Sequence, residues 1–349
     1  MKKDKVRGSL VGGACGDALG YPVEFIFSYK DIQEKYGEGG ITEYDREYIW
    51  INDSKGNLPA LVSDDTQMTL YTAEGLLTAI ETDAEYIPTI RDAYLAWFHG
   101  QTGEPVNIGY DSNLSKINDL NQRRAPGNTC LTALAAIVDG RNVRNDSKGC
   151  GGIMRVAPIG LYGVSHGWSD EDIAAIAGKV AEITHLHSLS TYPSAAFALI
   201  VKECVVTKDI DKSVFREIVE KSIGTVESLY GENAPYMNDF KRMMHNAMQL
   251  STSIDEDWKV IETNIGGGWV AEETLAIAIF SVLRHINDFK SCIVCSVNHG
   301  GDSDSTGAVA GNIIGAITGY DNIPTDFTDK LQFRELILSY SDALSTNTI

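Results

Sequence analysis

Two segments at opposite ends of the sequence carry glycine at every fourth position. The first stripe consists of Gly8, Gly12, Gly16 and Gly20, and the second of Gly307, Gly311, Gly315 and Gly319. A spacing of four places these glycines on one face of an α-helix. Each glycine in a helix interior costs about 1 kcal/mol relative to alanine. The two stripes therefore predict helices that approach each other closely or let a ligand reach their backbones.

Most of the remaining sequence also predicts helices. Apolar residues recur at helical spacing in Ala- and Leu-rich stretches at 69–82, 128–140, 170–187, 192–206 and 270–286. Strand signals are few. Residues 37–60 break every period and predict a long surface loop, which at this length is often a functional lid. We therefore expect an all-α fold in which residues 1–349 form a single domain.

The charge balance limits the class of partner. The 349 residues include 29 basic and 48 acidic side chains, for a formal net charge of -19. Because binding to nucleic acid phosphates requires a basic surface, we expect no nucleic acid partner. The acidity instead suits a soluble protein that takes positive charge from metal ions.

The cysteines indicate a reduced compartment. The six are sparse and mostly in apolar stretches, and we find no signal peptide, so we expect a cytoplasmic protein without a membrane anchor. Cys292 and Cys295 have zinc-type spacing, but no second Cys or His pair matches them. We interpret them as two small core residues on one helix face.

The second glycine stripe begins with acids, in the sequence GGDSDSTGAVAGNIIGAITG. A membrane span is excluded, because the uncharged run is shorter than the roughly 20 residues that a span needs. Asp302, Asp304, Thr306 and Gly307 match positions of an EF-hand calcium loop. The closing position, however, is Ile313 where that loop requires a glutamate. These residues therefore resemble half of a metal site.

A second group of acids precedes the helix predicted at 69–82. Ser63, Asp64 and Asp65 could simply cap this helix, since Ser and Asp are common N-cap residues. Two such groups, each with more carboxylates than a cap needs, favour a shared function. Clustered acids repel one another unless a cation compensates them, and their oxygen atoms suit Mg²⁺ or Mn²⁺. Asp17 and Glu24 lie near the first stripe and add to this pattern.

Six motifs, in order, resemble those of the ADP-ribosylglycohydrolases, which include the dinitrogenase-reductase-activating type. They occupy residues 12–24, 63–66, 126–129, 151–158, 184–187 and 300–316. The resemblance implies an orthogonal helical bundle with two Mg²⁺ or Mn²⁺ ions in a central cleft. The metal ligands that it implies are Ser63, Asp64, Asp65, Asp302, Asp304 and Ser305. Glu24, Asp65 and Asp302 would be catalytic.

The same resemblance implies a set of substrate-binding residues. It consists of Glu24, Gly127, Ser147, Gly149, Gly151, Gly152, His185 and Trp269. Glycine N–H groups suit a diphosphate because the ligand can approach them closely. Trp269 would stack on a base or ring, or alternatively belong to the core. His187 cannot share a helix face with His185.

The sequence departs from the family pattern at three places. The acidic loop at 302–305 reads Asp-Ser-Asp-Ser where Asp-Thr-Asp-Thr is commoner, and serine can coordinate a metal equally. Cys150 stands where many relatives have asparagine. Asn107 stands where some relatives carry an aspartate that resembles a catalytic acid, which leaves Glu24 or another carboxylate for that role.

The implied activity is hydrolysis at the anomeric carbon of ADP-ribose on a protein side chain or small molecule, by a monomer or small homo-oligomer. Two alternatives stay open. One is an immunity or binding protein directed at an ADP-ribosylating toxin. The other is a hydrolase of another small nucleotide or glycoside.

Overall fold

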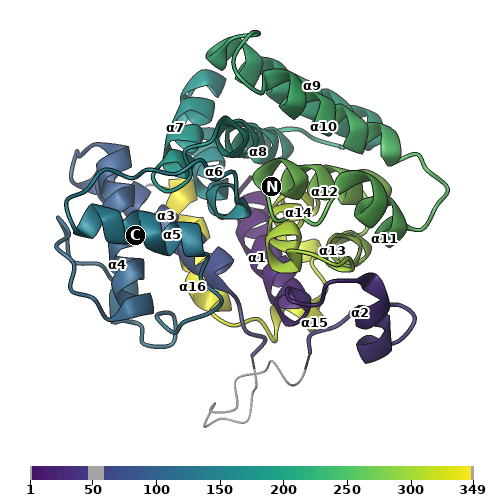
Figure 1. Cartoon of the computed structure of the whole chain (residues 1–349), viewed down its shortest axis with the longest axis horizontal. Helices are drawn as coiled ribbons and strands as arrows, with labels where there is room; N and C mark the ends of the chain where they lie inside the picture. Colours follow the sequence, from purple (N-terminus) through teal and green to yellow (C-terminus); the bar gives the residue numbers. More distant parts are fainter. Residues whose placement is uncertain (1, 46–58, 347–349) are drawn as a thin grey trace.

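Two antiparallel helices, α1 (Lys2–Gly20) and α14 (Ser303–Thr318), pack against each other along their glycine stripes at the centre of the structure (Figure 1). Gly12 lies against Gly311, and Gly16 against Gly307. A Cβ atom at Gly12 or Gly16 would overlap the carbonyl oxygen of the glycine opposite. The close approach predicted from the stripes is therefore confirmed, and it leaves no room for side chains between the two backbones.

The structure is a computed structural model and describes residues 2–45 and 59–346. The other α-helices in these ranges are α2 (Tyr29–Tyr36), α3 (Asp64–Glu81), α4 (Tyr86–Thr102), α5 (Asn128–Val138), α6 (Ala157–His166), α7 (Asp170–Glu182), α8 (Ser188–Val206), α9 (Lys212–Tyr230), α10 (Met237–Leu250), α11 (Asp257–Val260), α12 (Ala271–Arg284), α13 (Phe289–Val297), α15 (Thr325–Thr328) and α16 (Arg334–Thr346). Short 3-10 turns occur at η1 (Tyr21–Val23), η3 (Leu114–Lys116), η4 (Cys150–Gly152) and η6 (Tyr320–Asn322), and η5 (Ile261–Ile265) is a π-helix. No β-strand is present in these ranges, so the all-α prediction is confirmed.

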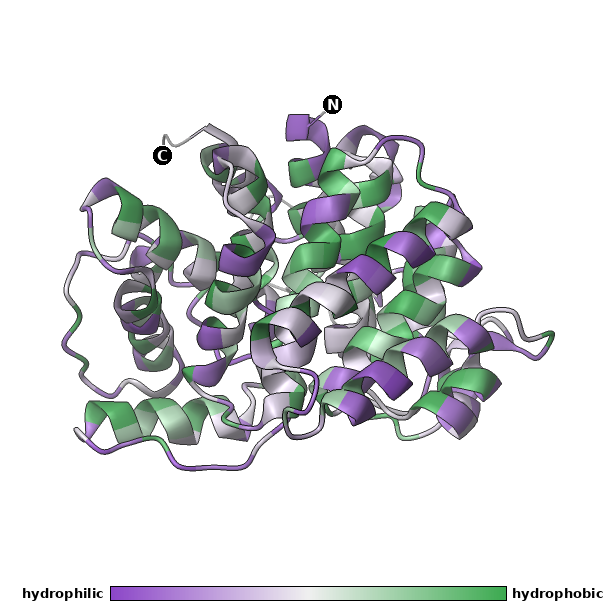
Figure 2. Cartoon of the chain, turned by 90° about the horizontal axis from the view of Figure 1, so that it is seen from above, coloured by the Kyte–Doolittle hydropathy of each residue, from purple (hydrophilic) through white to green (hydrophobic). Residues whose placement is uncertain are grey.

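The remaining helices surround the α1–α14 pair. In Figure 1, α3, α4, α5 and α16 lie to one side of it and α11, α12 and α13 to the other, with α9 and α10 at the top edge. Figure 2 shows hydrophobic and hydrophilic residues alternating along most helices, as expected for helices with one buried face. The helix α8 is long and apolar enough to span a membrane by length and composition, but 83% of that stretch is buried inside the bundle.

The predicted loop at 37–60 begins where α2 ends. Gly37 ends the helix at a φ of 94°, a left-handed value that glycine adopts without strain. Residues 46–58 lie outside the described residues, so the lid interpretation of this loop stays a prediction.

The glycine contact predicts a large asymmetry between two substitutions. Gly16→Ala should destabilise the fold by about 1–3 kcal/mol or more, because the added methyl group meets backbone atoms of α14. Gly224→Ala is the matched control, since Gly224 is exposed on α9 with open space around it. It should stabilise the protein by about 0.5–1 kcal/mol. Urea unfolding measures both, and equal effects would contradict the close contact.

Candidate active site

Most of the predicted site residues line one cavity of about 340 Å³. They are Glu24, Asp64, Asp65, Gly127, Gly149, Gly151, His185, Trp269, Asp302, Asp304 and Ser305. Acids, glycines, a histidine and a tryptophan from segments far apart in the sequence therefore meet at one place.

The glycine contact explains why acids from both ends of the chain meet. It places the end of α1 beside the start of α14, and Glu24 follows α1 after the single turn η1. Glu24, Asp302 and Asp304 are buried, and each offers a carboxylate oxygen within 4.8 Å of the other two. Asp302 stands at the N-cap of α14, but its side chain does not cap the helix. Its carboxylate is therefore available for another function.

The start of α3 supplies the opposite wall. The Ser63 hydroxyl accepts a hydrogen bond from the backbone N–H of Asp65 at 3.2 Å, so the capping interpretation is correct for this residue. Asp64 accepts a bond from the N–H of Gly127 at 3.2 Å. One Asp65 oxygen, Oδ1, is buried without a hydrogen-bond partner. Capping therefore explains Ser63 but not the two carboxylates that follow it.

Asp17, buried on α1, holds this wall in place. Its carboxylate accepts bonds from the N–H of Ser63 at 2.9 Å and from the N–H and hydroxyl of Thr66 at 3.1 and 2.5 Å. The sequence placed Asp17 near the cluster without giving it this role. Because it joins α1 to the start of α3, Asp17 positions the ligands rather than adding one.

The cluster concentrates negative charge in a buried space. Burial, followed by repulsion from neighbouring carboxylates, raises the pKa of Glu24 to about 11 and of Asp17 to about 7. The same two causes hold the pKa values of Asp64, Asp65 and Asp302 well above their usual range. The Glu24 Oε2 atom, like the Asp65 Oδ1 atom, has no hydrogen-bond partner. Carboxylate oxygens arranged in this way fit hard divalent cations.

His185 presents a neutral ring to the cavity. Arg155, fully buried, donates from Nη2 to the Thr184 hydroxyl at 2.6 Å, and that hydroxyl lies 2.8 Å from His185 Nδ1. Because Arg155 only donates, the Thr184 hydroxyl can donate its own proton to Nδ1, and in that tautomer the ring proton is on Nε2. Burial, with Arg155 as a second cause, lowers the pKa of His185 to about 3. The ring therefore offers an N–H donor to a ligand.

The glycines of this wall make room for the ring. A Cβ atom at Gly151 would lie 3.0 Å from His185 Cε1, and one at Gly149 would lie 3.2 Å from Nε2. Both contacts are tighter than side chains normally tolerate, so these two glycines set the position of the histidine as well as opening their own backbones.

Three polar or small residues stand behind the wall instead of lining it. The Ser147 hydroxyl lies 3.1 Å from that of Thr129 and accepts a bond from the N–H of Gly149 at 3.4 Å. A Cβ atom at Gly152 would overlap the Ser190 hydroxyl, so this glycine serves packing against α8. Ser63 also stands behind the wall, where its hydroxyl lies 3.5 Å from Asp65 Oδ2.

His187 has a structural role. It is the N-cap of α8, and its Nδ1 accepts a bond from the N–H of Leu189 at 2.9 Å.

An aromatic rim surrounds the mouth of the cavity. The Trp269 side chain is 39% exposed, so the alternative that it belongs to the core is wrong. Phe25 and Phe27 are 59% and 71% exposed, and their ring centroids lie 6.4 and 6.5 Å from that of Trp269. The sequence predicted Trp269 but not its two neighbours, because an apolar run after Glu24 normally predicts burial.

The departures from the family pattern at Cys150 and Asn107 have different consequences. Cys150 donates from its thiol to Asp302 Oδ2 at 2.8 Å, and burial raises the pKa of this thiol well above its usual range. A protonated Cys150 therefore orients a candidate metal ligand. Asn107 is exposed and does not line the cavity, so the stretch around it supplies no acid to the site.

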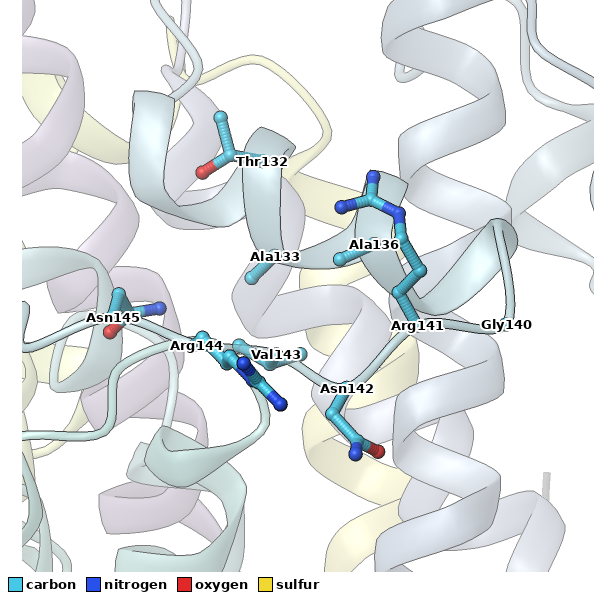
Figure 3. Close-up of a pocket in the computed structure, with 9 residues that line it drawn as sticks. All are labelled: Thr132, Ala133, Ala136, Gly140, Arg141, Asn142, Val143, Arg144 and Asn145. Carbon is cyan, nitrogen blue, oxygen red and sulfur yellow. The ribbon is translucent and has the colours of Figure 1, made fainter.

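A second cavity, of about 630 Å³, lies between α5 and residues 140–145 (Figure 3). Its side chains include Arg141 and Arg144 but no carboxylate. Of these two cavities we assign the chemistry to the smaller, because it combines the acid cluster with a neutral histidine and the other holds no carboxylate.

Comparison with known proteins identifies the family. The family model described as ADP-ribosylglycohydrolase matches residues 1–348. The chain belongs to the ADP-ribosylglycohydrolase family. It is therefore an enzyme of a family that hydrolyses ADP-ribosyl bonds, as the six motifs implied.

Relatives within the family match along nearly the whole chain. ADP-ribosylarginine hydrolase Tri1 of Serratia proteamaculans is 24% identical over 98% of this chain and 79% of its own length. The ADP-ribosyl-dinitrogen reductase glycohydrolase of Rhodospirillum rubrum is 25% identical over 95% of this chain and 91% of its own. A solved structure titled ADP-ribosylglycohydrolase-related protein complex superposes with a TM-score of 0.68 at 22% identity, covering 100% and 99% of the two chains. That likeness confirms the fold.

The electrostatics of the cluster predict the effect of Glu24→Gln on metal-free protein. The pKa of Glu24 in the folded protein, about 11, lies above its ordinary value of 4.5. As pH rises above 4.5, the unfolded chain loses the Glu24 proton while the folded protein keeps it, so the free energy of unfolding falls. In the presence of a chelator, Glu24→Gln should raise the unfolding free energy at pH 7 and change it little at pH 4.

Glu74→Gln is the control for a buried glutamate with satisfied oxygens. Glu74 accepts bonds from the Ser112 hydroxyl and from the N–H groups of Asn113 and Leu114. This variant should lose stability at pH 7. Urea unfolding at the two pH values measures both variants, and the same shift for Glu24→Gln at both would contradict the electrostatic account.

Proposed function

We propose that this enzyme is a metal-dependent, cytoplasmic ADP-ribosylhydrolase that cleaves the bond between ADP-ribose and a protein side chain at the anomeric carbon. The observation that carries the proposal is the arrangement of two acid-bearing helix starts, those of α3 and α14, on opposite walls of one cavity. Family membership supports the reaction class, and the buried, unpartnered oxygens of Glu24 and Asp65 support the metals.

The residues that would hold two Mg²⁺ or Mn²⁺ ions are Asp64, Asp65, Asp302, Asp304 and Ser305, which line the cavity. Ser63, the sixth predicted ligand, lies behind them and does not line the cavity. When bound, such ions orient ribose hydroxyls and lower the pKa of a coordinated water. The positive ends of α3 and α14 point into the same space and offset part of the negative charge of the acids. An acidic protein could in this way bind an anionic substrate.

The chain's own residues would bind and orient the substrate. Gly127, Gly149 and Gly151 line the wall where a diphosphate would approach, and their lack of side chains would let it come close. The N–H groups of Gly127 and Gly149 already donate to Asp64 and Ser147, which leaves the N–H of Gly151 for the ligand. The Nε2–H of His185 would donate a hydrogen bond to a substrate oxygen. Trp269 at the rim would stack on the base, since every base offers an apolar face.

Proton transfer would fall to the carboxylates. Glu24, which lines the cavity beside Asp302 and Asp304, could hold a proton and protonate the departing group. Asp65 or Asp302 would then take the proton of the attacking water, as paired carboxylates do in glycoside hydrolysis generally.

The first prediction concerns the ligand carboxylates. Asp302→Asn and Asp304→Asn should each reduce Mg²⁺- or Mn²⁺-dependent release of ADP-ribose by at least about 100-fold, the scale on which removal of one charge-stabilising group acts. Release from ADP-ribosyl-arginine, the linkage in the Serratia relative's name, is measured by chromatography beside ADP-ribosyl-serine.

Asp321→Asn is the matched control, because Asp321 is an exposed aspartate in η6. It should keep wild-type turnover. Full activity of Asp302→Asn would refute the metal assignment. No release from either substrate, with ADP-ribose still bound, would favour a binding role or another nucleotide or glycoside substrate.

The second prediction concerns the rim. Trp269→Ala should raise KM by roughly 5-fold or more, because a base–aromatic stack is worth about 1–3 kcal/mol. Trp269→Phe should retain most of the affinity, and kcat should change little in both variants. Steady-state kinetics measure kcat and KM separately. A fall in kcat at unchanged KM would place Trp269 outside the substrate-binding surface.

A further inference from the structure

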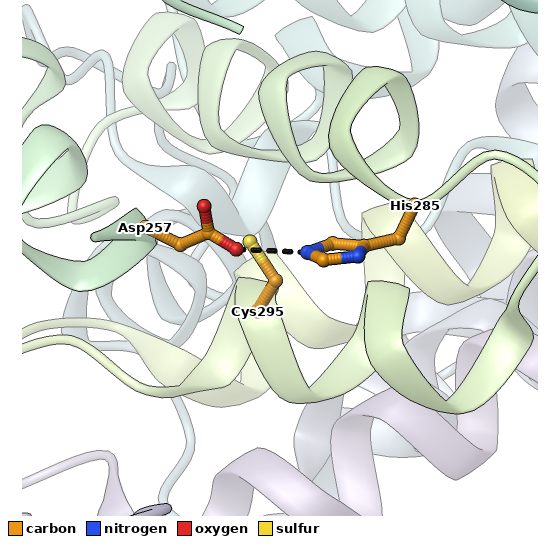
Figure 4. Close-up of side chains that lie close together, drawn as sticks. All are labelled: Asp257, His285 and Cys295. Atoms are coloured by element: carbon orange, nitrogen blue, oxygen red, sulfur yellow. Dashed lines mark hydrogen bonds and ion pairs between the residues drawn. The ribbon is translucent and has the colours of Figure 1, made fainter. Parts of the chain in front are cut away.

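Apart from the active-site acids, a second cluster of metal-ligating side chains lies on three other segments (Figure 4). Asp257 is the first residue of α11, His285 follows the last residue of α12, and Cys295 lies on α13. A carboxylate oxygen, an imidazole nitrogen and the thiol sulfur all lie within 4.8 Å of one another. His285 Nε2 is 2.8 Å from Asp257 Oδ2.

The two oxygens of Asp257 have different surroundings. Oδ1 lies 2.6 Å from Arg284 Nη2, and Arg284 is itself fixed by a bond from Nη1 to the Ser253 carbonyl at 2.5 Å. Oδ2 faces His285. Carboxylates that bind a metal through one oxygen commonly have the other held by a neighbour. Arg284 therefore orients the carboxylate and leaves Oδ2 for a cation.

The contacts do not form a nucleophilic triad. Such a triad needs the histidine between the thiol and the acid. Here His285 contacts the Asp257 carboxylate, and no hydrogen bond joins His285 to Cys295 among the described residues. Without that bond, the arrangement suits three donors around a common centre better than a relay of protons.

The donor set and the exposure together indicate the class of cation. One sulfur, one nitrogen and one oxygen form a set that zinc accepts and that Mg²⁺ does not prefer. The Asp257 and His285 side chains are 22% and 29% exposed, whereas Cys295 is buried. An ion could therefore enter from solvent, with a fourth position left for water.

We infer that Asp257, His285 and Cys295 form a zinc site, separate from the Mg²⁺ or Mn²⁺ centre proposed above and independent of it. The prediction that Cys295 is a core residue is confirmed by its burial, but it did not include the Asp257 and His285 side chains beside the thiol. Cys292, three residues earlier, is also buried and belongs to no such cluster among the described residues.

The site would brace the loop that carries the active-site acids. From α11 the chain continues into η5, where Glu262 accepts bonds from the N–H groups of Tyr29 at 2.7 Å and Gly300 at 2.9 Å. From α13 the chain continues directly to Asp302. An ion between Asp257 and Cys295 would therefore join both segments that hold residues 300–302.

Cobalt spectroscopy on the full chain tests the site. Co²⁺ bound through a thiolate gives a near-ultraviolet charge-transfer band, which an all-oxygen site does not give. The titration compares wild type with Cys295→Ser, Cys292→Ser and Cys150→Ser. Cys292→Ser is the control for a buried thiol on the same helix, and Cys150→Ser removes the thiol beside Asp302. We expect the band in all but Cys295→Ser, and Zn²⁺ should displace the cobalt.

Two results would overturn the inference. One is the absence of any band in wild type, and the other is a band that disappears in Cys150→Ser and persists in Cys295→Ser.

If circular dichroism shows that Cys295→Ser does not fold, the His285→Gln variant tests the site instead. It should weaken Zn²⁺ binding, measured by competition with a chelator, by more than the 10- to 100-fold typical of a residue that only orients a ligand. An unchanged affinity refutes the site. Failure of ADP-ribose hydrolysis would not alter the band, so the two proposals fail separately.

Discussion

The packing of α1 against α14 through glycine is the constraint on which the site depends. It brings together two ends of the chain that are about 300 residues apart, with each backbone touching the other. Because the contact is antiparallel, the last turn of α1 meets the first turn of α14. Glu24 and the acids at 302 and 304 consequently share one buried space. Larger residues along the stripes would separate the helices and, with them, the halves of the acid cluster.

The sequence predicted the helices and the acid cluster well, for physical reasons. Period and composition predict a helix at 69–82, and α3 spans Asp64–Glu81, so the prediction starts late and ends one residue past the helix. The match follows because apolar spacing is a local property. The glycine stripes predicted a close contact between two helices, because repeated glycine destabilises a helix unless the packing requires it. The family motifs then predicted that residues far apart in the sequence share one site, which no local pattern could predict.

What the sequence could not predict depends on three-dimensional contacts. Asp17 looked like one more acid, and only the fold shows its carboxylate holding the start of α3. The exposure of Phe25 and Phe27 contradicts their hydrophobicity, which normally predicts burial. The chain from Arg155 through Thr184 to His185 depends on hydrogen-bond directions that residue spacing does not encode. The cluster around Cys295 joins residues 257, 285 and 295, and their separation follows no known ligand spacing.

The crowding of carboxylates also has a consequence for the protein in the cell. A ligand that binds only the folded state adds to its stability in proportion to the logarithm of ligand concentration. On the proposed metal assignment, a cation-starved cell would hold this enzyme in a less stable form. Proteases remove proteins according to how often they unfold, so small losses of stability change abundance several-fold. The supply of divalent cations would then set the number of enzyme molecules as well as the activity of each.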